Sequence, residues 1–222
     1  MNNSSARGTR KSGFCVFVIF VSLTIVPVLA NDADPLQDFC VAQQSTILLN
    51  GLICKDPSTV NASDFAFHGL GKPGSTSNKA GSAVTPAFAA QFPALNTLGL
   101  SMARLDFAPG GLVTLHTHPR ATEVLYLAEG TLYVGFVDTA NTLFAQTLQK
   151  GDLFIFPKGL LHFQLNVGKV PALAISALNS QNPGVQLIPN ALFGSDISNA
   201  VLEKAFNIGK KQVERLKSKF SS

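Results

Sequence analysis

The segment 115–130, LHTHPRATEVLYLAEG, places two histidines one residue apart and a glutamate five residues after the second. Side chains at positions i and i+2 of a β-strand project to the same face, so His116 and His118 point together and Thr117 points to the opposite face. Imidazole and carboxylate groups are common ligands of transition metals. If the strand of Glu123 runs beside the histidine segment, we expect its carboxylate to meet both imidazoles.

A second patch, 151–166 (GDLFIFPKGLLHFQLN), contributes a third histidine, His162, which shares its strand face with Gln164 and Asn166. The chain contains only four histidines, and three of them lie in these two patches. One histidine in a strand is usually a core residue with satisfied hydrogen bonds, but burying three imidazoles and a carboxylate without partners would cost several kcal/mol. His68 has no ligand neighbours in sequence and is left out. The pattern predicts a metal site of four ligands: His116, His118, Glu123 and His162.

Three imidazoles with one hard carboxylate suit manganese, iron, nickel, copper or zinc. A structural zinc site would prefer cysteine ligands or a closed tetrahedron. A six-coordinate ion held by four protein groups keeps two positions for water or substrate, as redox or Lewis-acid chemistry requires. A catalytic-triad hydrolase is less well supported, because the sequence contains no G-x-S-x-G motif.

The segments around these residues have the pattern of strands. From Leu98 to Leu178, short apolar or alternating runs are separated by turn residues. Their lengths, spacing and content of Val, Phe, Tyr and Leu fit an antiparallel β-sandwich or barrel. Glu129-Gly130, between two such runs, predicts a tight hairpin turn. The sequence therefore predicts an all-β domain around the candidate site.

The periodicity changes towards the C-terminus. Apolar residues recur at helical spacing over 195–220, which predicts a pair of amphipathic helices. Ser195 or Asp196 is the predicted N-cap, and Gly209 is predicted to separate the first helix from the second. These helices either fold back on their own barrel or pack against another subunit.

Length and charge limit the class of protein. The chain has 222 residues, of which 46% are hydrophobic and 14% charged, so it is globular and forms one domain of ordinary size or two small ones. The formal charge of +4 is local, because Arg7, Arg10 and Lys11 lie in the first 30 residues, which contain no acid. Without them, 14 of the 17 basic residues remain against 13 acidic ones. This balance gives no electrostatic case for binding nucleic acid.

The N-terminus has the pattern of a secretory signal peptide. A polar, positive stretch (MNNSSARGTRKSG) precedes an apolar run (FCVFVIFVSLTIV), and Val28 and Ala30 occupy the −3 and −1 positions before Asn31. The apolar run is too short to span a bilayer comfortably, so an uncleaved anchor is the less favoured alternative. We therefore expect residues 1–30 to be removed, leaving a secreted protein without a membrane anchor.

The cysteines and one sequon agree with an extracellular protein. Cys15 lies in the apolar run and would be removed with it. Cys40 and Cys54 remain, and in an oxidising compartment a bridge between them would close a loop of about 15 residues and contribute about 3 kcal/mol. Two buried free thiols are the alternative. Asn61 begins the sequon Asn-Ala-Ser and is the candidate glycosylation site of the mature chain.

The candidate ligands also belong to two sequence motifs of the cupins. The first motif, G-x5-H-x-H-x4-E-x6-G, is matched at Gly110, His116, His118, Glu123 and Gly130. The second, G-x5-P-x-G-x2-H-x3-N, is matched at Gly151, Pro157, Gly159, His162 and Asn166. Within the cupins, the chain resembles the plant germin-like proteins along its whole mature length, through DPLQDFCVA, NGLICKDP, HTHPRATE, HFQLNVG, NSQNPG and LFGSD.

The resemblance implies a cupin jelly-roll β-barrel with C-terminal α-helices. The expected single domain, 31–222, comprises an N-terminal extension with a disulfide (31–82), a barrel (about 83–190) and helices (195–220). The resemblance further implies manganese (Mn2+) held by the four ligands, a Cys40–Cys54 bridge, and helices that clasp neighbouring subunits in a homohexamer built as a trimer of dimers. Germin-like proteins are extracellular, wall-associated glycoproteins linked to defence and development, which implies the apoplast or cell wall as the location.

One departure bears on the activity. Germins that are oxalate oxidases place asparagines near the metal, where these can hydrogen-bond the substrate. Aligned through the first motif, those positions here are Ala103 and Val113, whose side chains cannot donate a hydrogen bond. A site that lacks these donors loses much of its discrimination for the anion. Oxalate oxidation is therefore disfavoured.

Two other functions are compatible with the sequence. An open His3Glu site whose manganese cycles between Mn(II) and Mn(III) favours a superoxide dismutase-type enzyme, because superoxide is small and needs access more than a specificity pocket. The other hypothesis is a non-enzymatic wall component, small-ligand binder or reserve protein.

Overall fold

The computed structural model describes residues 38–43 and 52–220. The chain separates into two units, Met1–Ala30 and Asn31–Ser222. The predicted signal peptide, including Cys15, falls in the first unit and lies outside the described residues. In the part of the chain that is described, no helix is long and apolar enough to cross a membrane.

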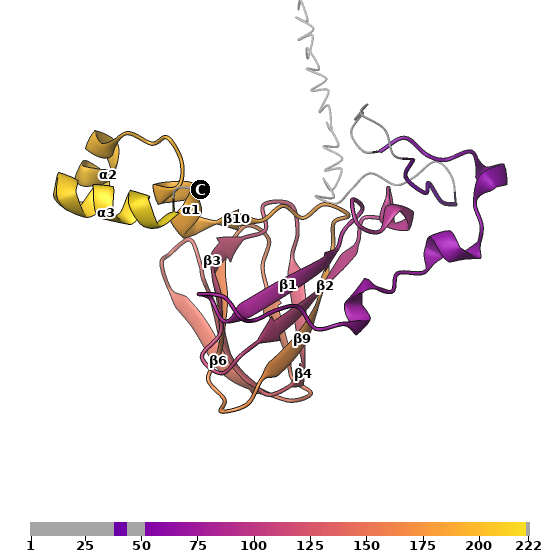
Figure 1. The fold of residues 1–222 in the computed structure, drawn as a ribbon, viewed down its shortest axis with the longest axis horizontal. Helices are drawn as coiled ribbons and strands as arrows, with labels where there is room; N and C mark the ends of the chain where they lie inside the picture. Colours follow the sequence, from indigo (N-terminus) through magenta and orange to yellow (C-terminus); the bar gives the residue numbers. More distant parts are fainter. Residues whose placement is uncertain (1–37, 44–51, 221–222) are drawn as a thin grey trace, which may run out of the picture. The chain divides into compact units, whose positions relative to one another are not determined.

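The strands of the second unit form two five-stranded antiparallel sheets (Figure 1). The first sheet has the order β1 (Ser82–Ala87), β2 (Ser101–Phe107), β9 (Ala172–Leu178), β4 (Glu123–Glu129) and β7 (Leu153–Phe156). The second has the order β10 (Gln186–Leu187), β3 (Leu112–Thr117), β8 (Leu161–Asn166), β5 (Thr131–Val137) and β6 (Leu143–Gln149). The predicted all-β jelly-roll is confirmed.

Alternation along the strands builds the interior. In β4, Leu125 and Leu127 are fully buried, whereas Tyr126 between them is exposed, because successive side chains of a strand point to opposite faces. On the other sheet, Leu132 and Val134 of β5 are equally buried. These four side chains belong to one apolar cluster drawn from both sheets. Each contributes roughly 1.5–3 kcal/mol through its burial.

The chain crosses from one sheet to the other at Gly130. The hairpin turn predicted at Glu129-Gly130 is wrong, because β4 pairs with β7 and β9, whereas β5 pairs with β6 and β8. Gly130 has a φ of 89°, and a Cβ there would lie 2.5 Å from the Cβ of Ala172. Only glycine fits this sharp passage between the sheets. A hairpin does join β5 to β6 through 138–142, where Asp138 accepts two backbone hydrogen bonds.

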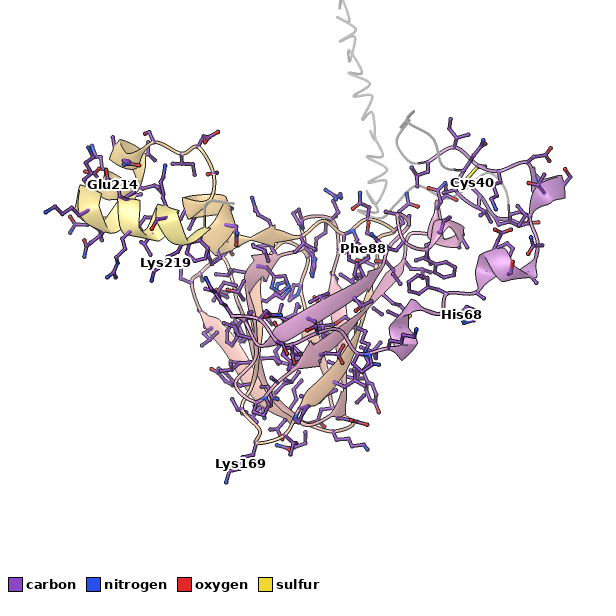
Figure 2. The ribbon with its side chains drawn as sticks, viewed as in Figure 1. Cys40, His68, Phe88, Lys169, Glu214 and Lys219 are labelled. Atoms are coloured by element: carbon purple, nitrogen blue, oxygen red, sulfur yellow. A yellow bond between two sulfur atoms is a disulfide. The ribbon has the colours of Figure 1, made fainter. Side chains whose placement is uncertain are left out.

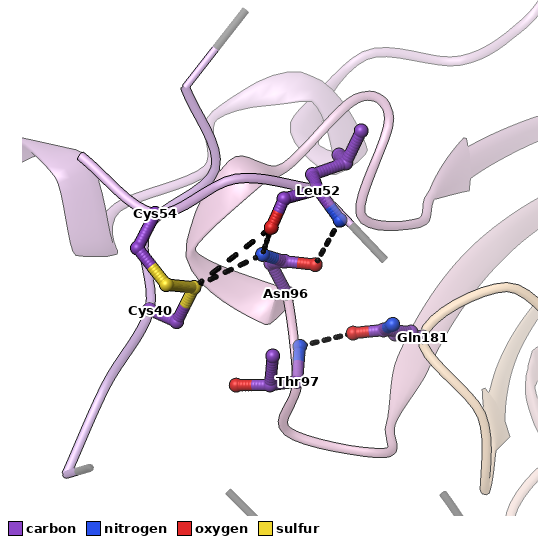
Figure 3. The surroundings of a disulfide bond; sticks show 6 residues. All are labelled: Cys40, Leu52, Cys54, Asn96, Thr97 and Gln181. Carbon is purple, nitrogen blue, oxygen red and sulfur yellow. Dashed lines mark hydrogen bonds between the residues drawn. A yellow bond between two sulfur atoms is a disulfide. The ribbon is translucent and has the colours of Figure 1, made fainter. Parts of the chain in front are cut away.

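The N-terminal segment is fastened by the predicted disulfide, which is present. Cys40 and Cys54 are bonded with their Cα atoms 4.8 Å apart (Figure 3). The buried side chain of Asn96 donates to the Leu52 carbonyl at 2.7 Å, accepts from the Leu52 amide at 3.2 Å, and lies 3.2 Å from Cys40 Sγ. Short 3-10 helices flank this region: η1 (Pro57–Thr59), η2 (Ala62–Phe65), η3 (Gly69–Gly71) and η4 (Pro93–Leu95).

The residue after Asn96 links this region to the segment that follows β9. The Thr97 amide donates a hydrogen bond to the side chain of Gln181 (Figure 3). Arg120, from the turn between β3 and β4, donates from Nε to the Asn182 carbonyl at 2.7 Å. Segment 181–184 is therefore hydrogen-bonded both to Thr97, next to the disulfide region, and to Arg120, in the turn before β4.

Three helices follow the strands: α1 (Ile188–Phe193), α2 (Asn199–Phe206) and α3 (Lys210–Phe220). The first of them was not predicted. The N-cap predicted at Ser195 or Asp196 is wrong, because α2 begins after Ser198, while the Ser195 hydroxyl donates to the Ala191 carbonyl in α1. Gly209 separates α2 from α3 as predicted.

The helices pack mainly through α3, which carries Glu214 and Lys219 (Figure 2). This helix contacts α1 and α2, and α1 contacts β3 and β10. Leu202 and Val213 are buried between the helices, whereas Val201 and Phe206 of α2 remain exposed. The helices therefore form a small apolar cluster of their own and leave apolar side chains of α2 uncovered.

Candidate metal centre

The three histidines come from two neighbouring strands. His116 lies in β3, His118 follows just after the last residue of that strand, and His162 lies in β8. In the ladder between the two strands, His116 is the direct partner of His162, and their ring centroids are 4.1 Å apart. The pairing of β3 with β8 therefore brings the two sequence patches together.

Glu123 comes from the other sheet. Its strand does not run beside the histidine segment, because β3 pairs with β8 and β10, and β4 pairs with β7 and β9. The carboxylate instead reaches the imidazoles across the barrel interior. Its Oε2 lies 3.0 Å from His118 Nε2 and 3.4 Å from His162 Nε2. The site therefore bridges the two sheets.

All four predicted ligands are gathered in one buried cluster. One ligand atom from each residue lies within 4.8 Å of every other. The exposed fractions are 4% for His116, 7% for His118, 2% for Glu123 and 1% for His162. His68, which the sequence argument left out, is exposed and precedes η3, and it is not part of this cluster.

Backbone carbonyl groups fix the tautomer of each imidazole. The Nδ1 atoms of His116, His118 and His162 lie 2.7, 2.7 and 2.8 Å from the carbonyl oxygens of Thr114, Gly184 and Leu160. A carbonyl oxygen only accepts hydrogen bonds, so each Nδ1 carries the proton. In the neutral ring, Nε2 then presents its lone pair, as metal-binding histidines require.

These lone pairs converge without a donor between them. Glu123 Oε2 and His162 Nε2 are buried and have no hydrogen-bond partner among the described residues. Two acceptors this close repel each other unless a cation or a proton lies between them. A transition-metal ion fits this donor set, because it binds three neutral imidazoles and a carboxylate at once.

The pKa values of the metal-free cluster reflect the same crowding. Burial, and then the neighbouring His162, lowers the pKa of His116 to about 4. Burial also lowers the pKa of His118, but the adjacent Glu123 carboxylate outweighs it and raises the pKa above the ordinary value. Burial alone would raise the pKa of Glu123, yet its contacts with His118 and His162 hold it well below its usual range. The carboxylate stays charged, and at least one imidazole stays neutral, across the physiological range.

Ser176 belongs to the site and was missed in the sequence. Its buried hydroxyl donates to Glu123 Oε1 at 2.5 Å, which leaves Oε2 to face the imidazoles. The available signal was its position in the strand ALAISAL, where Ser176 is an inward-facing polar residue between Ala174 and Leu178. The three carbonyl acceptors gave no such signal, because any residue type carries a backbone carbonyl.

Gln164 is a second buried polar side chain of the interior. It follows His162 by two residues in β8, is 0% exposed, and neither of its side-chain polar atoms has a partner among the described residues. Asn166, two residues further, is fully satisfied by the carbonyls of Ala108 and Val170 and the amide of Gly168. The two inward amides of β8 therefore differ sharply in their hydrogen bonding.

A cavity of about 350 Å³ adjoins the cluster. His116, His118 and Glu123 line it, and Ala103 and Val113, the positions singled out in the sequence, line it too. The rest of the wall includes Phe88, which Figure 2 labels at the end of the strands opposite to Lys169. Since His162 is not part of the lining, the other three ligands face the open space.

Comparison with known proteins identifies the class. Residues 68–214 match the cupin family model, and the chain belongs to this family. Within it, the chain is a germin-like protein. It is 52% identical over 205 residues to a putative germin-like protein 2-1 of Oryza sativa subsp. japonica, covering 90% of this chain and 95% of the relative. It is 52% identical over 212 residues to germin-like protein subfamily 2 member 4 of Arabidopsis thaliana, covering 94% and 96%.

Two solved structures extend the comparison. Oxalate oxidase in complex with the substrate analogue glycolate matches with a TM-score of 0.83 and 46% identity, covering 85% of this chain and 98% of that one. Peruvianin-I, a cysteine peptidase from Thevetia peruviana latex, matches with a TM-score of 0.68 and 44% identity, covering 70% and 97%. In the described part of this chain, both cysteines are consumed by the disulfide, so no free thiol is present there for such a peptidase. Similar folds carry different chemistries, and the activity must be argued from the site.

Proposed function

We propose that this chain is a secreted, manganese-binding germin-like protein of the plant apoplast or cell wall. We further propose a superoxide dismutase-type redox activity and a role in defence or development. The observation that carries the proposal is the buried cage in which three imidazole nitrogens and one carboxylate oxygen converge without a hydrogen-bond donor between them.

His116, His118, Glu123 and His162 would hold the metal. The carbonyl groups behind the imidazoles place the proton of each neutral ring on Nδ1, so that Nε2 is available to the metal, and the hydroxyl of Ser176 fixes the carboxylate. Bound manganese would supply one-electron exchange between its Mn(II) and Mn(III) states. The hard carboxylate together with imidazoles is compatible with this ion.

Dismutation converts two superoxide ions and two protons into dioxygen and hydrogen peroxide. A two-atom substrate needs a path to the ligands and a centre that accepts one electron and then donates one, but no recognition group. The cavity supplies the path, because it reaches three of the four ligands and is lined at its exposed side by Val84 and Val185. Its apolar wall offers no side chain that would compete with the substrate for protons.

The test combines metal analysis with an activity assay on one sample. Native protein should contain about one manganese per chain and dismutate superoxide faster than the same concentration of free Mn(II). His162→Ala should lose both the metal and the activity, whereas His68→Ala, which removes an exposed histidine outside the cage, should keep both. Metal-loaded protein no faster than free Mn(II) would refute the dismutase activity.

Oxalate oxidation is the second candidate, favoured by the similarity to oxalate oxidase. Against it stand Ala103 and Val113, which line the cavity with alanine and valine side chains that donate no hydrogen bond. We expect no oxalate-dependent peroxide production by the metal-loaded protein. Peroxide formation from oxalate, measured on the sample used for the dismutase assay, would replace the first candidate with the second.

Two features support the extracellular part of the proposal. The Cys40–Cys54 disulfide suits an oxidising compartment. Asn61, the proposed glycan site, is exposed at the start of η2, where an attached sugar would face solvent. Asn61→Gln should therefore lower the mass of protein secreted from plant cells by one glycan, and an unchanged mass would exclude glycosylation at this site.

The proposed homohexamer, a trimer of dimers, is supported by the exposed apolar side chains of α2. Val201 and Phe206 are 57% and 45% exposed, so both side chains are available for burial against another subunit. Light scattering of the purified protein should give the mass of six chains. A double change, Val201→Asp with Phe206→Asp, should reduce that mass, and a wild-type mass of one chain would refute the assembly.

A further inference from the structure

The cavity beside the cage is larger than a diatomic substrate requires. A water molecule occupies about 30 Å³ of liquid, and a dry cavity of about 150 Å³ in another protein binds benzene. The volume here, about 350 Å³, lies in the range of small-molecule sites. Superoxide would leave most of this space unfilled.

The polar groups of the cavity are confined to one side. They are the three ligands His116, His118 and Glu123, together with Ser176, whose hydroxyl is already donated to Glu123. The remaining lining comes from β1, β2, β3, β9, β10 and their flanks, and consists only of Val, Pro, Phe, Ala and Leu side chains. A molecule in this space therefore meets metal ligands at one end and hydrocarbon everywhere else.

The separation of the cavity into a polar end and an apolar end restricts where a bound molecule can carry charge. A charged group at the apolar end would lose its hydration and find no partner among the lining residues, which costs several kcal/mol. A dicarboxylate suffers this penalty at its second carboxylate, because Ala103 and Val113 offer no donor. An apolar body suffers no such penalty and gains about 25 cal/mol for each Å² that it buries.

We propose that the cavity binds an amphipathic organic molecule, with one oxygen or nitrogen donor towards the cage and an uncharged body about the size of two fused aromatic rings. This names a ligand class for the site of the proposed function and depends on that proposal only for the metal at its polar end. The apolar end of the cavity belongs to the fold and is present with or without the metal.

The probes are 1-naphthol and 1-naphthol-4-sulfonate, which share the rings and the hydroxyl donor but differ by one charge at the far end. Both fluoresce, and the chain contains no tryptophan to interfere. Titration of metal-loaded and chelator-stripped protein should show saturable binding of 1-naphthol to both forms, tighter with the metal. The sulfonate should bind at least about tenfold more weakly, which corresponds to about 1.4 kcal/mol.

A matched pair of variants locates the binding. Val84→Asp places a short charged side chain in the cavity wall, and Val170→Asp places the same charge at another exposed valine, which lies outside the lining (59% exposed, against 48% for Val84). We expect the first to weaken 1-naphthol binding by at least about tenfold and the second to leave it unchanged. Equal binding to the wild type and Val84→Asp, equal binding of the two probes, or no saturable binding to either form of the wild type would overturn the proposal.

The outcomes separate this proposal from the proposed function. A protein that takes up no metal but binds 1-naphthol with the expected selectivity supports the cavity and refutes the metal site. A protein that loads manganese and dismutates superoxide, yet binds neither probe, supports the enzyme and refutes the ligand class.

Discussion

The barrel interior contains two regions of opposite character on the same strands. In β4, Glu123 belongs to the cage, whereas Leu125 and Leu127, two and four residues further, belong to the apolar core. In β8, His162 belongs to the cage and is followed inward by Gln164. Strand alternation decides only that all of these side chains point inward. The apolar core stabilises the folded state by itself. The four ligands of the cage lower the stability of the folded state until a cation neutralises their converging lone pairs.

The largest expected effect comes from the core region. Leu127→Ala should lower the free energy of unfolding by about 2–5 kcal/mol, because Leu127 is 0% exposed and its removal leaves a cavity. The measurement is urea unfolding of the metal-free protein. Leu153→Ala in β7 is the control, since Leu153 is 63% exposed and its loss should change stability by at most about 0.5 kcal/mol. Similar losses in both variants would contradict the assignment of the core.

Acid should destabilise the cage region of the metal-free protein. The pKa of His116 is lowered from 6.5 to about 4 in the folded state, so between these pH values the unfolded chain binds a proton that the folded chain excludes. Stability should therefore fall as the pH falls from 6.5 to 4, by up to about 1.4 kcal/mol per pH unit. His118, with its raised pKa, binds its proton more tightly in the folded state, so near pH 6.5 it opposes the effect of His116, and well below its unfolded pKa it adds no slope.

Below pH 4.5 the lowered pKa of Glu123 adds a further loss, because the unfolded carboxylate takes up a proton before the folded one does. The measurement is the urea midpoint of metal-free protein from pH 6.5 to 4. His116→Gln should flatten the dependence. A wild-type midpoint that stays constant over this range would contradict the prediction.

A smaller effect is expected from the hydroxyl behind the carboxylate. Ser176→Ala removes the hydrogen bond to Glu123 Oε1 and should weaken metal affinity about 10–100-fold, because the carboxylate loses its fixed orientation. Competition with a chelator measures this affinity. Ser101→Ala is the matched control, since its buried hydroxyl bonds the Ser180 carbonyl instead of a ligand. An equal loss of affinity in both variants would indicate a general structural effect.

The smallest effect is expected at the unpaired amide. Gln164→Leu should leave the stability of the metal-free protein unchanged or raise it by up to about 1 kcal/mol, because no hydrogen bond is lost with the side chain. Asn166→Leu removes three hydrogen bonds from the neighbouring inward position and should cost at least about 1–3 kcal/mol. Thermal unfolding of the two variants distinguishes these results, and equal costs would show that Gln164 is satisfied after all.

The ligand set could be predicted from the sequence because it depends on the spacing of residues within single strands. The i, i+2 spacing of His116 and His118 and the inward position of His162 follow from strand alternation alone. The sheet neighbours of the Glu123 strand could not be predicted, because strand order depends on contacts between distant segments. The turn at Gly130 failed for a similar reason, since a glycine with positive φ serves a hairpin and a crossing between sheets equally well.

Other features were beyond a reading of residue types. The helix α1 has six residues, begins directly after β10 and has no side-chain cap, so it is too short to show a helical period. The carbonyls that orient the imidazoles belong to the backbone. The cavity exists only through the packing of β1, β2, β9 and β10 around the cage. These properties arise from contacts between segments that are distant in the sequence, and such contacts cannot be predicted from one sequence alone.

Asn96 connects the disulfide region to the proposed metal site through a short series of hydrogen bonds. The side chain of Asn96 hydrogen-bonds Cys40 Sγ and the Leu52 carbonyl. The amide of the next residue, Thr97, donates to the side chain of Gln181 in segment 181–184, and the Gly184 carbonyl of that segment orients His118. If the two cysteines stay reduced, this chain of contacts loses its covalent anchor. In the secreted manganese protein proposed above, metal uptake would therefore depend on oxidation of the Cys40–Cys54 pair.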